Sequence, residues 1–395
     1  MQQVGRARVA VVVAFALNGL AFASFMSRTP SLGETLGLST GQLALLLLCL
    51  SGGSITGLPL SGPLVQRFGP GRTVLLGAVA ETAGLAALAA GLLTGSVWPA
   101  AVGLFVAGLG TGVWDVAMNV GGAEVERRLG RSLMPRLHAA FSLGTVTGAA
   151  VGALAAATGV PLAAQLIGVV VLMPIVVTVV APRFLPGVPP EEQAAGGSVW
   201  AAWREPRTLV VGLLVLAFAF TEGSANDWIA YALSEGYGAG ETVGAIGFGV
   251  FVTAMTLGRM FGGSALERFG RVAVLRVAAG FALVGLLMVI VGGSVAVALA
   301  GALLWGLGAS LGFPVGMSAA ADDPARAAAR VSVVSSIGYT AFLAGPPLIG
   351  LLAESEGILR ALFVVLGALV LGLLASGAAR PVTGTTRPPA APARR

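Results

Sequence analysis

Four carboxylates interrupt long apolar stretches of the sequence, and they are the residues most suited to chemistry. Glu81, Asp115, Glu222 and Asp227 each lie within a stretch of small and apolar residues. A carboxylate in the middle of a membrane span costs about 2.5–3.5 kcal/mol on insertion scales, so each is expected to have a function or a polar partner. The chemistry open to them is proton binding and contact with a polar solute.

Asp115 and Asn119 are one helical turn apart, and Gly108, Gly112 and Gly122 share their stripe. A stripe of glycines packs against protein rather than lipid, so Asp115 is expected to point inward. Two roles fit this position. Asp115 either binds protons or solute in a cavity, or forms a structural hydrogen bond to a neighbouring helix.

Glu222 and Asn226 are also one turn apart on one helix face. Asp227 is rotated by about 140° from Glu222 in an unbroken helix. It therefore shares the site only if Gly223 lets the helix unwind, as glycine-interrupted helices can where they line a cavity inside a membrane. A solvent-exposed acid at the outer end of the helix is the alternative for Asp227.

Several other side chains could serve a solute site. Trp305 and Tyr339 could stack on a ring-shaped solute, although core aromatic residues need no function. His138 could carry protons at neutral pH or anchor the loop before its helix. Glu81 is expected to tie two helices together.

The composition is that of a membrane protein. Of the 395 residues, 56% are hydrophobic and 10% are charged, whereas a soluble domain carries about a quarter charged residues. One histidine and one cysteine exclude a disulfide scaffold and argue against a metal site. The chain has no lysine, which excludes a phosphate-binding Gly-x-x-x-x-Gly-Lys loop.

A Gly-x-Ser-x-Gly match around Ser310 lies inside an apolar run rather than at a strand-to-helix turn, so we expect no hydrolase. The sequence therefore predicts neither an enzyme nor a cofactor.

Twelve apolar runs are long enough to cross a bilayer core, which requires about 20 helical residues. They lie at about 9–28, 40–65, 73–94, 97–122, 136–158, 162–181, 208–232, 242–265, 272–292, 295–318, 331–352 and 358–377. Spans of this length must be helices, because helices satisfy their backbone groups in lipid.

The arginines predict the orientation. All 23 basic residues are arginines. If both termini are cytoplasmic, all but Arg28 and Arg360 fall on the cytoplasmic side or at helix ends near it, as the positive-inside rule requires. The basic charge is thus a topology signal, and we expect no nucleic-acid partner.

The segment 182–207 is rich in proline, glycine and charge, and reads as a cytoplasmic linker. The predicted organisation is an N-terminal six-helix bundle (1–181), the linker (182–207), a C-terminal six-helix bundle (208–379) and a disordered cytoplasmic tail (380–395). A glycine face on the fifth run (Gly144, Gly148, Gly152) could mark a dimer, but packing inside the bundle is the preferred interpretation. We expect a monomer.

A short motif occurs once in each half, at an offset of 201 residues. It reads Gly62-Pro-Leu-Val-Gln66-Arg67-Phe68-Gly69 and Gly263-Ser-Ala-Leu-Glu267-Arg268-Phe269-Gly270. The first glycine of each copy would allow close helix approach, and the last suits a tight turn. The arginine can reach acidic groups or the carbonyls at a helix end. Duplicated six-helix halves are a known way to build a transporter that rocks around a central site.

The repeated motif resembles the Gly-x-x-x-Asp-Arg-x-Gly-Arg signature of the major facilitator superfamily, and the resemblance covers nearly the whole chain. Gln66 replaces the usual aspartate in the first copy, whereas Glu267 keeps an acid in the second. If this acid helps to lock the cytoplasmic side, the lock of the first half is expected to be weaker.

Other stretches are similar to the fucose-permease-like branch and its uncharacterised bacterial inner-membrane relatives. They are Ser27-Arg28-Thr-Pro30, Asp115-Val-Ala-Met-Asn119, His138-Ala-Ala-Phe-Ser142-Leu-Gly144, Glu222-x-x-x-Asn226-Asp227-Trp228 and Gly345-Pro346-Pro347-x-x-Gly350. The resemblance implies a multi-pass protein of the bacterial cytoplasmic membrane, with twelve helices in two pseudo-symmetric bundles.

In that family, the first, fourth, seventh and tenth helices line the cavity. Here they carry Asn18, Asp115 with Asn119, Glu222 with Asn226, and Trp305. The resemblance also places the first and seventh helices face to face. Arg28 would therefore pair with Asp227 or Glu222 as an outer gate, unless it snorkels to headgroups.

The preferred function is secondary active transport by alternating access, as proton-coupled uptake of a polar, sugar-like solute. Asn18, Asn119 and Asn226 suit a hydroxyl-rich solute. Phe22, Phe25 and Trp305 would suit an amphipathic one, exported against protons. An uncoupled uniporter is the third interpretation. The expected partners are the solute, protons and the lipid bilayer.

Overall fold

The computed structural model of the chain describes residues 2–129, 133–186, 199–323 and 326–381. Part of the predicted linker (187–198) and most of the predicted disordered tail (382–395) lie outside these residues. Twelve helices of the described part are long and apolar enough to cross a membrane, which confirms the predicted number of spans.

The first half of the chain contains seven helices, of which six are long and α2 is a short segment between α1 and α3. Their bounds are α1 Gln2–Met26, α2 Thr29–Leu36, α3 Thr40–Phe68, α4 Pro70–Thr94, α5 Val97–Leu129, α6 Met134–Ala157 and α7 Leu162–Val180, followed by the turn η1 Ala181–Arg183.

The second half repeats this plan with more interruptions. Its elements are α8 Val199–Ala202, α9 Pro206–Tyr231, η3 Ala232–Gly236, α10 Glu241–Phe269, α11 Arg271–Val291, α12 Val295–Ala309, α13 Gly312–Ala320, α14 Ala327–Glu356, α15 Ile358–Ala361, α16 Phe363–Ala375 and η4 Ser376–Ala379. The predicted tenth run is divided into α12 and α13, and the predicted twelfth run comprises α15, α16 and η4.

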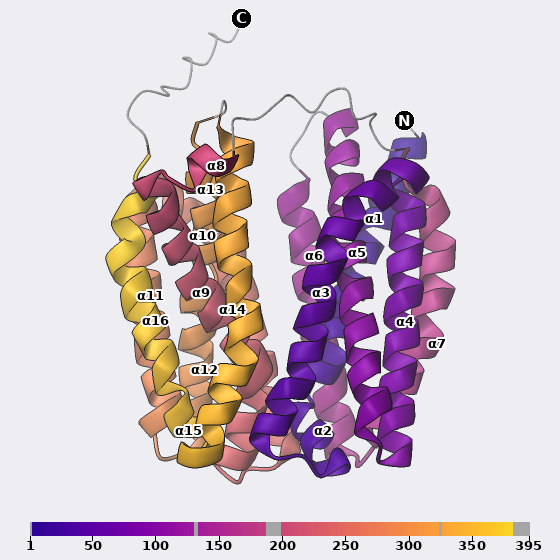
Figure 1. Ribbon diagram of the computed structural model, residues 1–395, viewed down its shortest axis with the longest axis vertical. Coiled ribbons are helices and arrows are strands. Elements are labelled where there is room, and N and C mark those ends of the chain that lie inside the picture. The colour runs from indigo at the N-terminus through magenta and orange to yellow at the C-terminus, as the bar shows by residue number, and fades with distance from the viewer. Residues whose placement is uncertain (1, 130–132, 187–198, 324–325, 382–395) are drawn as a thin grey trace, which may run out of the picture.

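The helices form two bundles that stand side by side (Figure 1). In the first, α5 packs against α3 and α4, α1 packs against α6, and α7 lies against α4. In the second, α11 packs against α12, and α9 packs against α14 and α16. The bundles meet where α6 contacts α10 and where α3 contacts α14.

Glycines bring α4 and α5 into backbone contact along an antiparallel seam. A Cβ at Gly84 would lie 2.3 Å from the backbone nitrogen of Ala107, and one at Gly110 would lie 2.3 Å from that of Glu81. In the other half, a Cβ at Gly308 would likewise lie 2.3 Å from the backbone nitrogen of Ala282. The close packing expected of small residues in membrane helices therefore occurs in both halves.

The glycine face of α6 also packs inside its bundle. A Cβ at Gly144 would lie 1.9 Å from the carbonyl oxygen of Ala16, and one at Gly148 would lie 2.5 Å from that of Leu20. Both carbonyls belong to α1, so the interpretation of this face as internal packing is confirmed.

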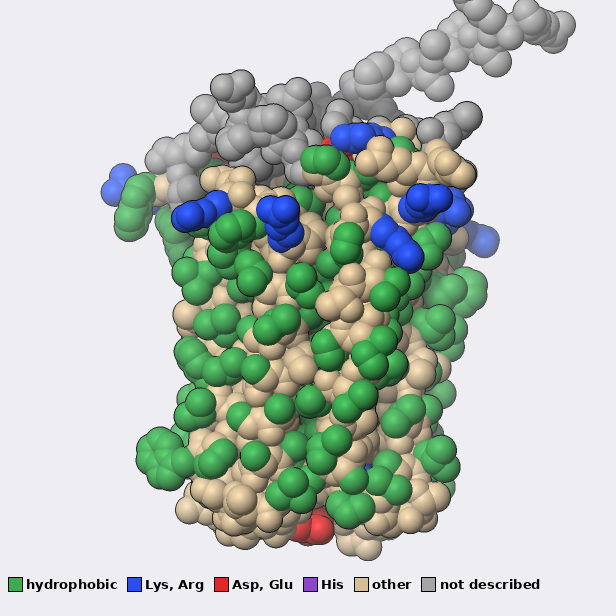
Figure 2. All heavy atoms as spheres, turned by 90° about the vertical axis from the view of Figure 1, so that its right-hand side faces the viewer, with side chains coloured by type: hydrophobic (Ala, Val, Ile, Leu, Met, Phe, Trp, Pro, Cys, Tyr) green, Lys and Arg blue, Asp and Glu red, His purple; other side chains and the backbone are tan. Residues whose placement is uncertain are grey.

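The two ends of the molecule differ in charge. We call the end that carries both chain termini the terminal face, and the end formed by α2, η3 and α15 the opposite face (Figure 1). Arginine side chains gather near the terminal face, beyond a belt of exposed apolar side chains (Figure 2). This belt is the surface expected to meet lipid.

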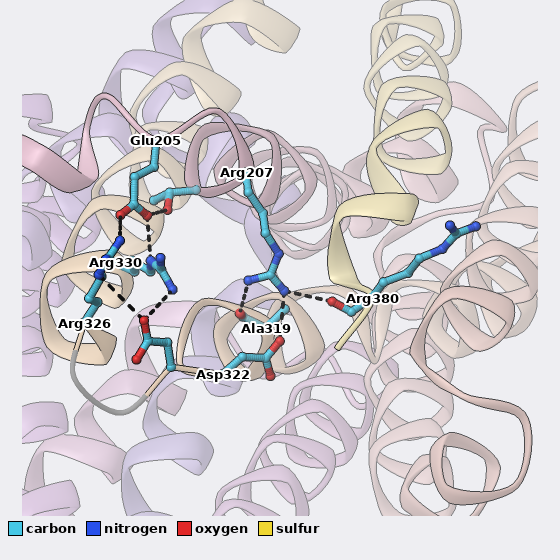
Figure 3. A network of polar contacts seen from close by, with 9 residues as sticks. Glu205, Arg207, Ala319, Asp322, Arg326, Arg330 and Arg380 are labelled. Carbon is cyan, nitrogen blue, oxygen red and sulfur yellow. Dashed lines mark hydrogen bonds and ion pairs between the residues drawn. The ribbon is translucent and has the colours of Figure 1, made fainter. Parts of the chain in front are cut away.

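A polar network joins elements of the second bundle at the terminal face (Figure 3). Glu205, just before α9, accepts hydrogen bonds from Arg326 at 3.1 Å and Arg330 at 2.6 Å. Asp322 accepts from Arg207 at 2.8 Å and from Arg271 at 2.7 Å. The network fixes the start of α9 to the turn between α13 and α14.

Candidate functional site

A cavity of about 310 Å³ lies between the two bundles. Polar side chains from both halves of the chain line it. They include Asn18 of α1, Asp115 of α5, Glu222, Asn226 and Asp227 of α9, Arg259 of α10 and Tyr339 of α14. The structure thus brings together six of the residues that the sequence singled out and adds Arg259.

Asp115 is held on the first-half wall of this cavity. The side-chain amide of Asn119 donates to the Asp115 carboxylate at 3.2 Å and to its backbone carbonyl at 2.8 Å. Asn119 itself is not among the residues that line the cavity. Asn119 is therefore not placed as the predicted solute contact; it holds the Asp115 side chain instead.

Glu222 forms an ion pair that the sequence analysis missed. Nη2 of Arg259 donates to both carboxylate oxygens of Glu222, at 2.9 and 2.8 Å, while Nε donates to the Ser310 carbonyl at 3.2 Å. The prediction that all arginines except Arg28 and Arg360 lie on the cytoplasmic side or at helix ends near it is wrong for Arg259, which lines the cavity. Its position inside an apolar run, ten residues before the helix end, was the available signal.

Asp227 lines the cavity without any break in α9. The expectation that Gly223 must unwind the helix is wrong, because α9 is continuous from Pro206 to Tyr231. Glu222, Asn226 and Asp227 all reach the cavity, which therefore extends around a wide sector of this helix.

Aromatic side chains form part of the apolar lining, beside aliphatic and methionine side chains. Phe22, Phe141, Phe342 and Tyr339 contribute to it. Trp305 does not, so its prediction as a solute contact is wrong. Its indole is fully buried and packs edge-on against Phe251 of α10, with ring centroids 5.6 Å apart.

Asn18 and His138 differ in their surroundings. Asn18 is buried, and its side-chain nitrogen has no hydrogen-bond partner among the described residues. His138 is exposed and packs edge-on against Phe15, with ring centroids 5.4 Å apart. His138 is not part of the cavity lining.

Arg28 joins the bundles at the opposite face, but not through the predicted partners. It is 3% exposed, and its Nε and Nη2 donate to the two carboxylate oxygens of Glu241, both at 2.7 Å. The predicted pairing of Arg28 with Asp227 or Glu222 is therefore wrong. Glu241 is the first residue of α10, and an acidic side chain is stabilised at a helix N-terminus by the helix dipole. This local role explains the acid at that position, so the sequence gave no reason to expect a distant partner.

The surroundings of this ion pair come from α2, from α7 and from the connection between α6 and α7. Arg28 Nη1 donates to the Val160 carbonyl at 2.7 Å and to the Gln165 side chain at 3.2 Å. The Ser31 hydroxyl also donates to Glu241. The guanidinium is thus fully enclosed by first-half groups on one side and Glu241 on the other.

A second set of contacts joins the bundles at the same face. Glu354 of α14 accepts hydrogen bonds from the Ser39 hydroxyl and, at 3.2 Å, from the backbone nitrogen of Gly41. The Thr40 and Tyr231 hydroxyls are 3.1 Å apart. All hydrogen bonds between described residues of the two bundles lie at the opposite face.

The repeated motifs adopt the same conformation. Gly69 and Gly270, which connect α3 to α4 and α10 to α11, have φ of 78° and 77°, a region open mainly to glycine. The guanidinium of Arg67 lies 5.4 Å from the ring centroid of Phe68, and that of Arg268 lies 5.2 Å from the centroid of Phe269.

The first glycine of each motif does not behave as predicted. A Cβ at Gly62 or Gly263 would meet nothing within 4 Å, so neither mediates close helix approach here. Glu267 is exposed at the same surface. The close approaches lie one and a half turns earlier, where a Cβ at Gly57 would be 2.4 Å from the carbonyl oxygen of Leu109.

Metal binding has no support in the geometry. Within the described ranges, no group of three or more His, Cys, Asp or Glu side chains is placed to hold a metal ion.

The chain is similar to several bacterial membrane transporters. It is 33% identical over 381 residues to an uncharacterized MFS-type transporter of Yersinia pestis, covering 95% of this chain and 96% of that protein. It is 31% identical over 357 residues to an uncharacterized transporter of Sinorhizobium fredii, covering 90% of this chain and 93% of that protein. These relatives place it among multi-pass transporters of the bacterial cytoplasmic membrane rather than among enzymes.

Solved structures share the fold at low sequence identity. A mutant of the nucleoside transporter NupG superposes with a TM-score of 0.78 at 13% identity, covering 94% of this chain and 99% of that one. The Escherichia coli fucose:proton symporter FucP superposes with a TM-score of 0.59 at 16% identity, covering 94% and 99%. Residues 11–231 also match the Major Facilitator Superfamily directly. The chain belongs to the major facilitator superfamily of transporters.

Proposed function

We propose that the protein couples the uptake of a small polar, sugar-like solute to the inward movement of protons. The termini lie in the cytoplasm, and one solute molecule binds in the cavity between the bundles. The observation that carries this proposal is that carboxylates from both halves, Asp115 and Asp227, line that cavity together with Asn18 and Asn226.

The character of the cavity supports a polar solute. Amide side chains both donate and accept hydrogen bonds, as hydroxyl groups do. The unpaired side-chain nitrogen of Asn18 is a donor available to a solute. NupG is a nucleoside transporter and FucP is a fucose:proton symporter, and both solutes are hydroxylated rings.

Asp115 and Glu222, the two carboxylates predicted to couple protons, have different roles in this proposal. Glu222 is held by Arg259 in a charge-assisted contact, whereas the Asp115 carboxylate accepts from the neutral amide of Asn119. Carboxylates inside membrane spans commonly mark proton pathways. Asp115 therefore binds the coupled proton, and Glu222 with Arg259 keeps the second-half wall electrically balanced.

The contacts between the bundles support a cavity that opens toward the cytoplasm. The ion pair of Arg28 with Glu241 and the contacts of Glu354 close the opposite face. The arginine-rich terminal face is then the cytoplasmic one, as the positive-inside rule expects. Alternating access requires this closure to break as the terminal face closes.

Efflux of amphipathic compounds is the second candidate, and the aromatic lining favours it. Phe22, Phe141 and Phe342 provide a surface for an apolar ring. In an exporter the same Asp115 proton would enter as the solute leaves, so the exchange is antiport rather than symport.

Reconstitution in liposomes with an internal pH dye tests the proposal. Hexoses, nucleosides, small acids and amphipathic cations are added in turn, with an imposed membrane potential and then without it. Symport predicts that hexoses or nucleosides acidify the lumen as they enter. Acidification as an amphipathic compound leaves preloaded vesicles would establish antiport, and solute movement without any pH change would leave a uniporter.

A further inference from the structure

Glu81 is a buried carboxylate that the proposed mechanism does not use. It lies in the middle of α4, within the seam where α4 contacts α5. It is 2% exposed, and its Oε2 has no hydrogen-bond partner among the described residues. A charged carboxylate in such a place is costly unless it is paired or neutralised by a proton.

The second half provides an internal comparison. Ala282 occupies the position of Glu81 at the repeat offset of 201, on α11, and it is fully buried. The seams have the same geometry, because a Cβ at Gly110 or at Gly308 would lie 2.3 Å from the backbone nitrogen of Glu81 or Ala282, respectively. The fold therefore forms this seam equally well around an alanine, and the carboxyl group of Glu81 is not needed for packing.

Thr111 lies between Glu81 and the cavity. It belongs to α5, directly follows Gly110, which packs against the backbone of Glu81, and lines the cavity one turn from Asp115. Its hydroxyl donates its hydrogen to the Ala107 carbonyl at 2.9 Å. The Thr111 oxygen keeps its capacity to accept a hydrogen bond, and a carboxyl group could donate one to it only when protonated.

Few other ionisable groups lie around Glu81. On α5 the nearest along the helix is Asp115, and the described residues of α7 include none. Cys49 lies farther along α3. The other ionisable groups on elements packed against α4 lie near the ends of those elements, and they are Arg67, Glu34, Arg183, Glu124, Glu126 and Arg128. No cation partner is therefore placed at the carboxyl group of Glu81 in the described part of the chain.

We propose that Glu81 is a second proton-binding site of the transporter, set behind the cavity wall and reached past Thr111. A hydronium ion in the cavity gives its proton to Oε2 of Glu81 and leaves as water. The resulting carboxyl group is neutral, as its burial without a cation partner requires. This site is additional to coupling at Asp115 and does not depend on it, because Glu81 binds its proton with no solute present.

Infrared spectroscopy of the purified full-length protein in nanodiscs, without solute, tests the proposal. The C=O stretching band of protonated carboxyl groups is compared at neutral pH among wild type, Glu81→Gln and Asp115→Asn. The spectrum of wild type minus that of Glu81→Gln should contain one such band. The same band should be present in the spectrum of Asp115→Asn. An identical band in wild type and Glu81→Gln would overturn the proposal.

Two further measurements address stability and access. Glu81→Ala, which copies the other half, should have a thermal midpoint equal to or above that of wild type; a clear decrease would show a structural tie instead. On transfer to D₂O, Thr111→Val should slow the deuterium shift of the Glu81 band. Thr82→Val is the matched control, because the Thr82 hydroxyl contacts Met173 Sδ of α7 at 3.2 Å. Equal rates of the deuterium shift in the two variants would contradict the proposal that protons reach Glu81 past Thr111.

Discussion

Arg28 and Glu241 form the ion pair that closes the opposite face between the bundles. The two residues are 213 positions apart in the sequence and contribute two hydrogen bonds of 2.7 Å. The Arg28 side chain is almost completely buried, whereas 21% of the Glu241 side chain is exposed. Removal of the glutamate would leave a buried charge without its partner, which is unfavourable.

We predict that Glu241→Gln shifts the protein toward states with an open opposite face. The expected change is about 1–3 kcal/mol, the usual cost of an unsatisfied buried group. Spin labels at Thr35→Cys and Ser355→Cys, with Cys49 replaced, measure the separation of the bundles by electron–electron resonance. Glu356→Gln is the control, because its partner Arg360 lies in the same half and both side chains are exposed. Equal distance distributions in the two variants would contradict the role of the pair.

The backbone contact of α3 with α5 predicts a strong difference between two adjacent glycines. A Cβ at Gly53 would lie 1.9 Å from the carbonyl oxygen of Phe105, whereas one at Gly52 would meet nothing within 4 Å. Gly53→Ala should therefore destabilise the protein by about 1–3 kcal/mol. Gly52→Ala should be neutral or slightly stabilising, because alanine favours a helix interior. Thermal unfolding of both variants measures the difference, and equal midpoints would refute the close contact.

The network at the terminal face predicts acid sensitivity of the second bundle (Figure 3). Hydrogen bonds from Arg330, which has the largest effect, and from Thr208 and Arg326 lower the pKa of Glu205 from 4.5 to about 2. A lowered pKa in the folded state contributes stability above the unfolded value, and this contribution is lost as the pH falls toward 2. Wild type should thus lose stability between about pH 4.5 and pH 2.

Glu205→Gln should flatten this dependence, because glutamine does not titrate. Thermal midpoints recorded across that pH range for wild type, Glu205→Gln and the exposed control Glu356→Gln measure the effect. The account fails here if Glu205→Gln keeps the slope of wild type.

The cavity ion pair predicts non-additive effects of two substitutions. Either Arg259→Gln or Glu222→Gln leaves a charge facing the cavity without its partner, whereas the double variant removes both charges. Coupling energies for contacting residues are about 0.5–3 kcal/mol. Each single variant should therefore unfold at a lower temperature than the double variant. Strictly additive midpoints would indicate that the two side chains do not interact.

The fold followed from the sequence because its determinants are local. Runs of apolar residues set the number of helices, and the repeated motif ending in Gly69 and Gly270 marked equivalent turns that adopt the same φ. Spacing along a helix also placed Asp115, Glu222 and Asn226 on inward faces, and all three line the cavity.

The side-chain pairings could not be predicted from the sequence, because they join helices that are distant in the sequence. The facing of the first and seventh helices predicts Asp227 or Glu222 as the partner of Arg28, but it gives no reason to expect Glu241, which begins a different helix. Arg259 lies ten residues before the end of α10, deeper in its helix than Arg268, but its partner Glu222 lies on a different helix. Trp305 lies on the expected helix, yet its ring fills the contact with Phe251 instead of the cavity.

Solute-driven proton movement in liposomes tests the central claim most directly, with wild type compared with Asp115→Asn. With a solute identified by the panel, wild type should acidify the lumen during uptake. Asp115→Asn should retain exchange of labelled for unlabelled solute while losing the pH change and accumulation against a gradient. Glu222→Gln reports whether the Arg259 pair is also required. Full proton coupling in Asp115→Asn would contradict the assignment of the coupling site, and wild-type transport without proton movement would contradict the proposed symport itself.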